Sequence, residues 1–179
     1  MTYPNEVIKA IHTRRSVREY TGKKPTVDEI QKILEAGAWA PSGLNNQPWR
    51  FIVIRDNETK SELAELTHYK HTVLSAPVLI SVFLDLEASY DRDKDLMAIG
   101  ACNQNMLLAA HSLGLGAVWL GEILKRKEDV NTLLAVPETW ELTAVIALGY
   151  PAQKNRSSNR KQLDELVYLE RFGEPFDMS

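Results

Sequence analysis

Ala40-Pro-Ser-Gly-Leu-Asn-Asn-Gln-Pro-Trp49 is the stretch around which the rest of the chain is organised. It is a polar loop between an amphipathic helical pattern and an apolar strand pattern. The loop supplies backbone amides, Asn and Gln carboxamides and a Ser hydroxyl, but no nucleophile with a base beside it and no set of metal ligands. Such neutral donors and acceptors could hold a flat heterocycle by its edge.

The same loop has a simpler interpretation as a turn between a helix and a strand. Pro, Ser, Gly and Asn are common turn-forming residues, which accounts for Pro41, Gly43 and Pro48. The polar side chains just before Trp49 are not explained in this way. They are Ser42, Asn45, Asn46 and Gln47.

Secondary-structure signals extend from this loop in both directions. Thr26-Val-Asp-Glu29 is a capping box that begins a helix, and this helix should end at Ala40 because proline disfavours helix in the residue before it. Strand patterns occupy residues 49–55, 77–84, 117–120 and 142–150. Further helical patterns occupy residues 5–13, 96–113 and 127–135, and one more begins at residue 56 and fades near residues 67–71.

The arrangement of these patterns predicts one domain in which helices pack around a sheet that need not be fully parallel. The charged residues 85–95 read as a loop. The helix at residues 96–113 is apolar on most of its circumference, so we expect it to be buried on several sides or to place one face in a subunit interface. Residues 151–179 form a polar tail with scattered apolar anchors, which we expect to be an arm around a partner subunit.

Composition excludes several classes of protein. The chain has 179 residues, of which 44% are apolar and 25% charged, as in an ordinary globular domain. Its lone cysteine, Cys102, cannot form an intramolecular disulfide and fits a reducing compartment. The sequence shows no signal peptide and no apolar run of the roughly 18 residues that a membrane-spanning helix needs. We therefore expect a cytoplasmic protein with no membrane partner.

Positive charge is concentrated near the two ends of a chain whose net charge is -3. Arg14, Arg15 and Arg18 surround Ser16, and a second cluster includes Lys154, Arg156, Arg160 and Lys161. Guanidinium groups and a hydroxyl suit phosphate oxygens, although arginines after a surface helix are often merely solvated. Two small clusters favour one small anion over a nucleic acid, whose binders carry a larger basic surface.

Other chemical motifs are rejected. Gly114 to Gly121 resembles a dinucleotide-binding loop, but it follows a helix and opens a strand, which reverses the required order. His68 and His71 lack the other ligands of a metal site and are expected at the surface or at a pocket rim. His111 is expected to be a hydrogen-bonded core residue, and Cys102 an inert buried thiol. The sequence therefore predicts no metal and no catalytic side chain.

Seven stretches in the same order resemble the FMN-dependent nitroreductase family. They are Arg14-Arg-Ser-Val-Arg18, residues 40–51, Cys102-Asn-Gln-Asn105, Ala109-Ala-His-Ser-Leu-Gly-Leu-Gly116, Trp119-Leu-Gly121, Leu148-Gly-Tyr-Pro151 and Arg160-Lys-Gln-Leu163. The resemblance covers nearly the whole chain. It implies an α+β fold, a three-layer α-β-α sandwich with a mixed, largely antiparallel sheet, built as an intertwined homodimer with FMN at the subunit interface.

The resemblance also assigns residues to the cofactor. Arg14, Arg15, Ser16 and Arg18 match the ligands of the FMN phosphate and ribityl side, joined by Arg160 and, less closely, Lys161 because the usual proline after the lysine is missing. The flavin would be contacted by the loop of the other subunit through Pro41, Ser42, Gly43, Asn45 and Gln47. The backbone of Leu120 and Gly121 matches the segment that hydrogen-bonds flavin N5.

The implied function is an NAD(P)H-dependent oxidoreductase in which the flavin carries the chemistry. NADH or NADPH would be the donor, and nitroaromatics, quinones or similar flat electron-poor molecules the acceptors, in a ping-pong sequence. Two alternatives stay open. One is a reductive dehalogenase or a flavin-fragmenting enzyme of the same fold, and the other is a flavin-binding protein without enzymatic activity.

Overall fold

A four-stranded antiparallel sheet forms the centre of the molecule in the computed structural model, which describes residues 3–153 and 157–177. The strand order is β1 (Trp49–Ile54), β2 (Val78–Asp85), β4 (Trp140–Gly149) and β3 (Gly116–Leu120). All three strand pairs are antiparallel, and an isolated bridge between Ser16 and Ala117 adds a parallel contact at the free edge of β3. The α+β fold with a largely antiparallel sheet is confirmed.

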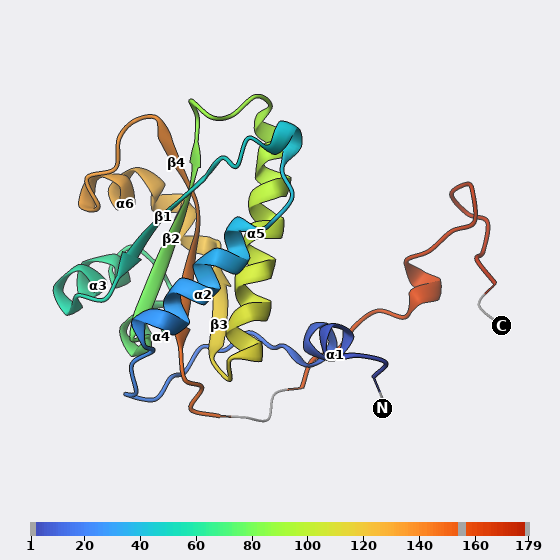
Figure 1. The fold of residues 1–179 in the computed structure, drawn as a ribbon, viewed down its shortest axis with the longest axis horizontal. Coiled ribbons are helices and arrows are strands. Elements are labelled where there is room, and N and C mark those ends of the chain that lie inside the picture. The colour runs from blue at the N-terminus through green and yellow to red at the C-terminus, as the bar shows by residue number, and fades with distance from the viewer. Residues whose placement is uncertain (1–2, 154–156, 178–179) are drawn as a thin grey trace.

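Helices cover both faces of the sheet, which gives the three expected layers (Figure 1). Alternate residues of each strand point to opposite faces, so Ile80 and Val82 join one apolar core while Leu79 and Phe83 join the other. The first core includes side chains of α2 (Val27–Ala38) and α5 (Arg92–Ser112). The second includes side chains of α3 (Asn57–Ala64), α4 (Lys70–Ser75) and α6 (Lys127–Leu133).

Helix α2 follows its sequence signals closely. The Thr26 hydroxyl accepts from the Glu29 backbone N–H at 3.1 Å, and the Glu29 carboxylate accepts from the Thr26 N–H at 2.7 Å, which confirms the capping box. The helix ends at Ala38, two residues before the expected end. Gly37 lets α2 approach α5 closely, because a Cβ at this position would lie 2.7 Å from Met106 Cγ.

The charged segment 85–95 is only partly a loop. Residue Asp85 belongs to β2, and α5 already begins at Arg92, so the expected start of this helix at residue 96 is four residues late. Asp91 caps α5 by accepting from the Lys94 N–H at 3.2 Å. The acidic residues that suggested a loop are the cap and first turn of a helix, where negative charge is favourable.

Four shorter elements were not expected as separate structures. Helix α4 occupies the place where the sequence pattern fades. The other three are the 3₁₀ turns η1 (Gly43–Asn45), η2 (Glu122–Arg126) and η3 (Leu163–Glu165).

Cys102 is fully buried, and burial raises the pKa of its thiol to about 12, as expected for an inert cysteine. None of the helices among the described residues is long and apolar enough to cross a membrane.

Two segments extend away from this body. Helix α1 (Glu6–Thr13) buries none of its residues, and the C-terminal segment from residue 157 runs outward beyond it (Figure 1). The large apolar residues of that segment are exposed. They are Leu163, Leu166, Tyr168, Leu169, Phe172 and Phe176. The described residues 157–177 of the arm predicted for residues 151–179 thus extend from the body, and the contact of the arm with a partner subunit stays a prediction.

Candidate cofactor-binding site

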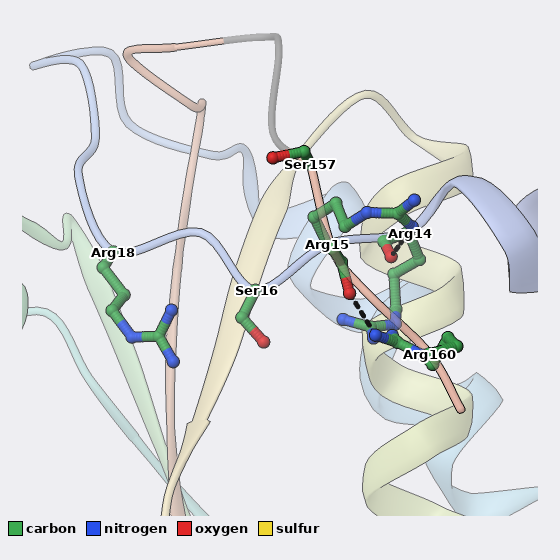
Figure 2. Close-up of a pocket in the computed structure, with 7 residues that line it drawn as sticks. Arg14, Arg15, Ser16, Arg18, Ser157 and Arg160 are labelled. Atoms are coloured by element: carbon green, nitrogen blue, oxygen red, sulfur yellow. Dashed lines mark hydrogen bonds between the residues drawn. The ribbon is translucent and has the colours of Figure 1, made fainter.

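A cavity of about 580 Å3 lies at the junction of α1, the edge of β3 and the C-terminal segment. Its lining residues are Arg14, Arg15, Ser16, Arg18, Ser157, Ser158 and Arg160. Figure 2 shows Arg14 and Arg15 beside Arg160, with Ser16 and Arg18 further along the same segment. The structure therefore brings together residues that are more than 140 positions apart in the sequence.

The edge of the sheet fixes the position of the arginine segment. Val17 donates its N–H to the Ala117 carbonyl at 3.1 Å, beside the Ser16–Ala117 bridge. Gly116 leaves room for this contact, since a Cβ there would lie 2.6 Å from Val17 Cγ2. Tyr20 is buried and donates its hydroxyl to the Ala147 carbonyl at 2.9 Å. The segment is thus held to β3 through Val17 and to β4 through Tyr20.

The cavity carries positive charge that no acidic group balances. Within residues 3–153 and 157–177, no ion pair joins Arg14, Arg15, Arg18 or Arg160 to a carboxylate. Burial, followed by the nearby charges of Arg160 and Arg15, lowers the pKa of the Arg14 guanidinium. These guanidinium groups still keep their charge, because an arginine does not lose its proton in proteins. An anion bound here would relieve their mutual repulsion.

Hydrogen-bond donors in the cavity remain without acceptors. The Nε atoms of Arg14 and Arg15 are buried and have no hydrogen-bond partner among the described residues. Buried donors without partners are uncommon and costly, by about 1–3 kcal/mol each. Arg15 Nη1 donates to the carbonyls of His12 and Arg14 at 2.6 and 2.8 Å, which fixes the orientation of its side chain. The free donors and the positive charge suit the oxygens of a phosphate group.

The second basic cluster is only partly in this cavity. Arg160 lines it and donates to the Ser158 hydroxyl and to the Asn159 carbonyl. Lys161 is not among the described lining residues, while Lys154 and Arg156 lie outside the residues that the structure describes. Sequence reasoning did not identify Ser157 and Ser158. Their position between basic residues, in Arg156-Ser-Ser-Asn-Arg160, was the available signal.

Leu120 and Gly121 lie on the same edge of the sheet. Leu120 ends β3 and is buried, whereas Gly121 is exposed and a Cβ at that position would meet no atom within 4 Å. Gly121 lies four positions after Ala117, which is roughly 13 Å at the usual rise per residue of a strand. An anion at the arginines and a flat group at Gly121 could therefore be two ends of one extended ligand.

Glu122, the residue after Gly121, holds the segment that contains Thr67 and His68 close to the end of β3. Glu122 accepts from the Thr67 hydroxyl at 2.9 Å and from the His68 N–H at 3.1 Å. These hydrogen bonds lower the pKa of Glu122, that from the His68 backbone most. His68 is exposed, as the sequence predicts. No group of His, Cys, Asp and Glu suited to a metal ion occurs in the described part of the chain.

The loop that contains the remaining predicted site residues, Pro41 to Gln47, is here called the clamp loop. Leu44, Asn45 and Gln47 have φ angles of 54°, 55° and 46°, in the left-handed region that residues with a side chain rarely adopt. Such residues are each strained by about 1–3 kcal/mol and persist only when the surroundings fix them. The Ser42 hydroxyl accepts from the Gln47 N–H at 3.0 Å and closes the loop on itself.

The clamp loop and the arginine cavity are far apart in one chain. Asn46 contacts Asp95 in the first turn of α5, whereas Thr13, just before Arg14, contacts His111 in the last turn at 2.8 Å. The 16 residues between Asp95 and His111 correspond to roughly 24 Å of helix. Consistent with this separation, none of the predicted loop residues lines the arginine cavity. They are Pro41, Ser42, Gly43, Asn45 and Gln47.

His111 is hydrogen-bonded as predicted, but it is half-buried and not a core residue. Its Nε2 lies 2.8 Å from the Thr13 hydroxyl. Burial, followed by the charges of Arg14 and Arg15, lowers the pKa of the imidazole. A neutral His111 adds no positive charge beside the arginine cavity and joins the end of α1 to α5.

Comparison with known proteins places this architecture in a family. The sequence model of the Nitroreductase family matches residues 11–70 and 64–150. A relative from Archaeoglobus fulgidus, named as a candidate NADH dehydrogenase/NAD(P)H nitroreductase, is 39% identical over 149 residues, which is 82% of this chain and 86% of the relative.

Solved structures agree with the sequence comparison. A candidate nitroreductase from Desulfovibrio desulfuricans, in complex with FMN, superposes with a TM-score of 0.90 at 51% identity, covering 95% of this chain and 99% of the other. The NADPH:FMN oxidoreductase from Vibrio harveyi, in complex with NAD+, superposes with a TM-score of 0.87 at 27% identity, covering 95% and 79%. Since the family match spans the sheet, its helices and the arginine segment, this chain belongs to the nitroreductase family.

Proposed function

We propose that this protein is an FMN-dependent oxidoreductase that takes electrons from NADH or NADPH. The observation that carries the proposal is the arginine cavity, which suits a phosphate group because its guanidinium groups have no carboxylate partner, and two buried Nε donors no acceptor, among the described residues. The relatives support the identity of the ligand, because one was solved with FMN and another is an NADPH:FMN oxidoreductase.

The described residues fit the two ends of FMN. Arg14, Arg15, Ser16, Arg18 and Arg160 would bind the phosphate and its neighbouring hydroxyl groups, and Ser157 and Ser158 add further hydroxyl donors. The open backbone at Gly121, after the buried Leu120, would receive the edge of the ring. Lys161 is not included in this set, because it does not line the cavity.

FMN, when bound, supplies the hydride-accepting ring, and the protein supplies binding and orientation. The arginines would balance the negative charge of the cofactor and hold it through charge-assisted hydrogen bonds. Glu122 would keep Thr67 and His68 fixed beside Gly121, so that the rim of the ring site is ordered before a substrate arrives. Fixed polar groups of this kind are favourable because they need no reorganisation during the reaction.

A complete site requires a second copy of the chain. The clamp loop lies roughly 24 Å along α5 from the arginine cavity, so it would contact the cofactor bound by its partner. An apolar groove between α1, α2 and α5 supports a homodimer. Its volume is about 520 Å3, and the side chain of Trp39, which lines it, is 86% exposed. Val7, Ala36, Leu108 and Ala109 also line this groove. Large exposed apolar surfaces of this kind mark protein interfaces.

The two substrates would use one open face in turn, in a ping-pong sequence. The antiparallel order of the described strands offers no βαβ crossover of the kind that binds nicotinamide dinucleotides. NADH or NADPH would bind first and leave, and a flat electron-poor acceptor such as a nitroaromatic or a quinone would then take its place.

Anaerobic stopped-flow mixing of the FMN-loaded protein with NADH and with NADPH tests this proposal. We expect loss of the oxidised flavin absorbance with at least one donor, followed by its return when a nitroaromatic or a quinone is added in a second mixing step. Inertness toward both donors would leave only a flavin-binding protein. Parallel assays for halide release and for benzimidazole release identify the alternative enzymes of the same fold.

A further inference from the structure

Asp95 is a buried carboxylate that connects the clamp loop to helix α5. It is 0% exposed and lies in the first turn of the helix. Its Oδ1 accepts from Asn46 Nδ2 at 2.8 Å, and its Oδ2 accepts from the Ser89 hydroxyl at 2.7 Å and from the Tyr90 N–H at 3.1 Å. One side chain therefore holds two separate segments, the clamp loop and the turn that precedes α5.

The carboxylate stays charged without a cation beside it. No ion pair to Asp95 occurs within residues 3–153 and 157–177. Burial raises the pKa of Asp95, but the hydrogen bonds from Asn46, Ser89, Tyr90 and Asp91 together outweigh it and hold the pKa below its usual value. A buried charge is costly unless hydrogen bonds satisfy it. The carboxylate therefore holds these donors in position, and they keep it ionised.

This network holds the clamp loop in its strained shape. Asn46 Nδ2 also donates to the Ala88 carbonyl at 3.1 Å, which joins the loop to the turn a second time. Tyr90 packs against the loop so closely that a Cβ at Gly43 would lie 2.0 Å from its hydroxyl. Asn46 itself sits between Asn45 and Gln47, whose φ angles are 55° and 46°. Loss of the anchor would let these residues relax to ordinary backbone angles.

We propose that Asp95 is a positioning residue for the cofactor site, which presets the clamp loop through Asn46 so that its polar groups meet the FMN of the partner subunit. The inference rests on the proposed function of the loop. Asp95 itself does not touch the cofactor. It acts by removing the conformational freedom that the loop would otherwise lose when FMN binds.

The test compares four variants of the full-length apo-protein. Asp95→Asn removes the negative charge of the carboxylate. Asn46→Ala removes the amide that donates to this carboxylate from the clamp loop. Asp91→Asn is the matched control, because Asp91 is a carboxylate of the same turn that caps α5 and has no described hydrogen bond to the clamp loop. In the double variant Asn46→Asp with Asp95→Asn, the amide and the carboxylate exchange places and can form the bond again.

FMN affinity is measured by quenching of FMN fluorescence at a temperature at which circular dichroism shows every variant to be folded. We expect Asp95→Asn and Asn46→Ala to raise the Kd for FMN at least tenfold and to change the visible circular dichroism of the bound flavin. Asp91→Asn should stay within twofold of the wild type. The exchanged double variant should recover part of the lost affinity, because it restores the bond between positions 46 and 95 but not the donation to the Ala88 carbonyl. A purely structural role would lower the melting temperature without changing the Kd or the flavin spectrum of folded protein.

The results separate this inference from the proposed function. A wild-type protein without affinity for FMN would contradict the proposed function itself. If the wild type binds FMN and Asp95→Asn binds it equally well, only the role of Asp95 is overturned. If Asp95→Asn does not fold, Asn46→Ala decides alone, and wild-type affinity in this variant overturns the proposal. Equal losses in Asp91→Asn and Asp95→Asn would overturn it as well.

Discussion

The surroundings of Arg14 favour a bound anion in the arginine cavity. Its guanidinium is partly buried near Arg15 and Arg160, and burial and both neighbours lower its pKa. In the free protein these charges repel one another, whereas a bound phosphate would turn each of them into a charge-assisted hydrogen-bond donor. The residues that are proposed to bind the cofactor would therefore destabilise the fold when the cavity is empty.

Replacement of two arginines should remove the cofactor without unfolding the protein. We expect Arg14→Ala with Arg160→Ala to be colourless after purification, since each hydrogen bond to a charged group contributes about 1.5–3 kcal/mol. The ratio of flavin to protein absorbance measures the loss, and circular dichroism checks the fold. Lys161→Ala is the matched control, because Lys161 follows Arg160 but does not line the cavity. Full flavin content in the double variant would refute the phosphate assignment.

Some residues of the arginine cavity could be predicted from the sequence, and others could not. The types of Arg14, Ser16 and Arg160 indicated a phosphate site, and the structure brings them into one cavity. The part of Ser157 and Ser158 was not evident, because a serine in a polar tail has no distinctive pattern. The contact of Asn46 with Asp95 was also not predicted, since it joins residues 49 positions apart.

Elements with strong local signals were predicted well. Helix α2 begins at its capping box, and β2 is a continuous apolar run that is buried along its whole length. Helix α4 and the first turn of α5 were missed because their sequences are polar or charged. In both cases packing against the sheet or a capping side chain decides the structure, and neither effect appears in a periodicity of apolar residues.

The capping box of α2 can be tested by itself. Thr26→Ala removes the hydroxyl that accepts from the Glu29 N–H, and we expect it to lower the free energy of unfolding by about 1 kcal/mol. Urea denaturation measures the change. Thr26→Ser keeps the hydroxyl and should stay close to the wild type. An equal loss in both variants would show that the methyl group, rather than the cap, carries the effect.

At the scale of the whole molecule, the separation of the clamp loop from the arginine cavity is the physical argument for the proposed homodimer. Sequence order did not reveal this separation, because residues 14–18 and 41–47 are close along the chain. The family resemblance of the sequence implies a homodimer, whereas the order of its residues does not. The structure supports it physically through the 21-residue helix α5, which places the two halves of the proposed site at opposite ends.

Disruption of the apolar groove should therefore cause loss of FMN, although the groove and the arginine cavity share no lining residue. We expect Trp39→Asp to produce monomers that lose FMN although every arginine remains, since Trp39 lines the groove and is 86% exposed in one chain. Analytical ultracentrifugation reports the assembly, and flavin absorbance reports the cofactor. Val27→Asp is the control, because Val27 begins the helix that Trp39 directly follows, is 67% exposed and does not line the groove. A monomer of Trp39→Asp that keeps its FMN would rule out a site shared between subunits.

The absorption spectrum of the purified protein tests the central claim most directly. The account predicts a yellow protein whose flavin band is released as free FMN on denaturation and is bleached by NADH or NADPH in the absence of oxygen. A colourless protein that takes up no added FMN would contradict it.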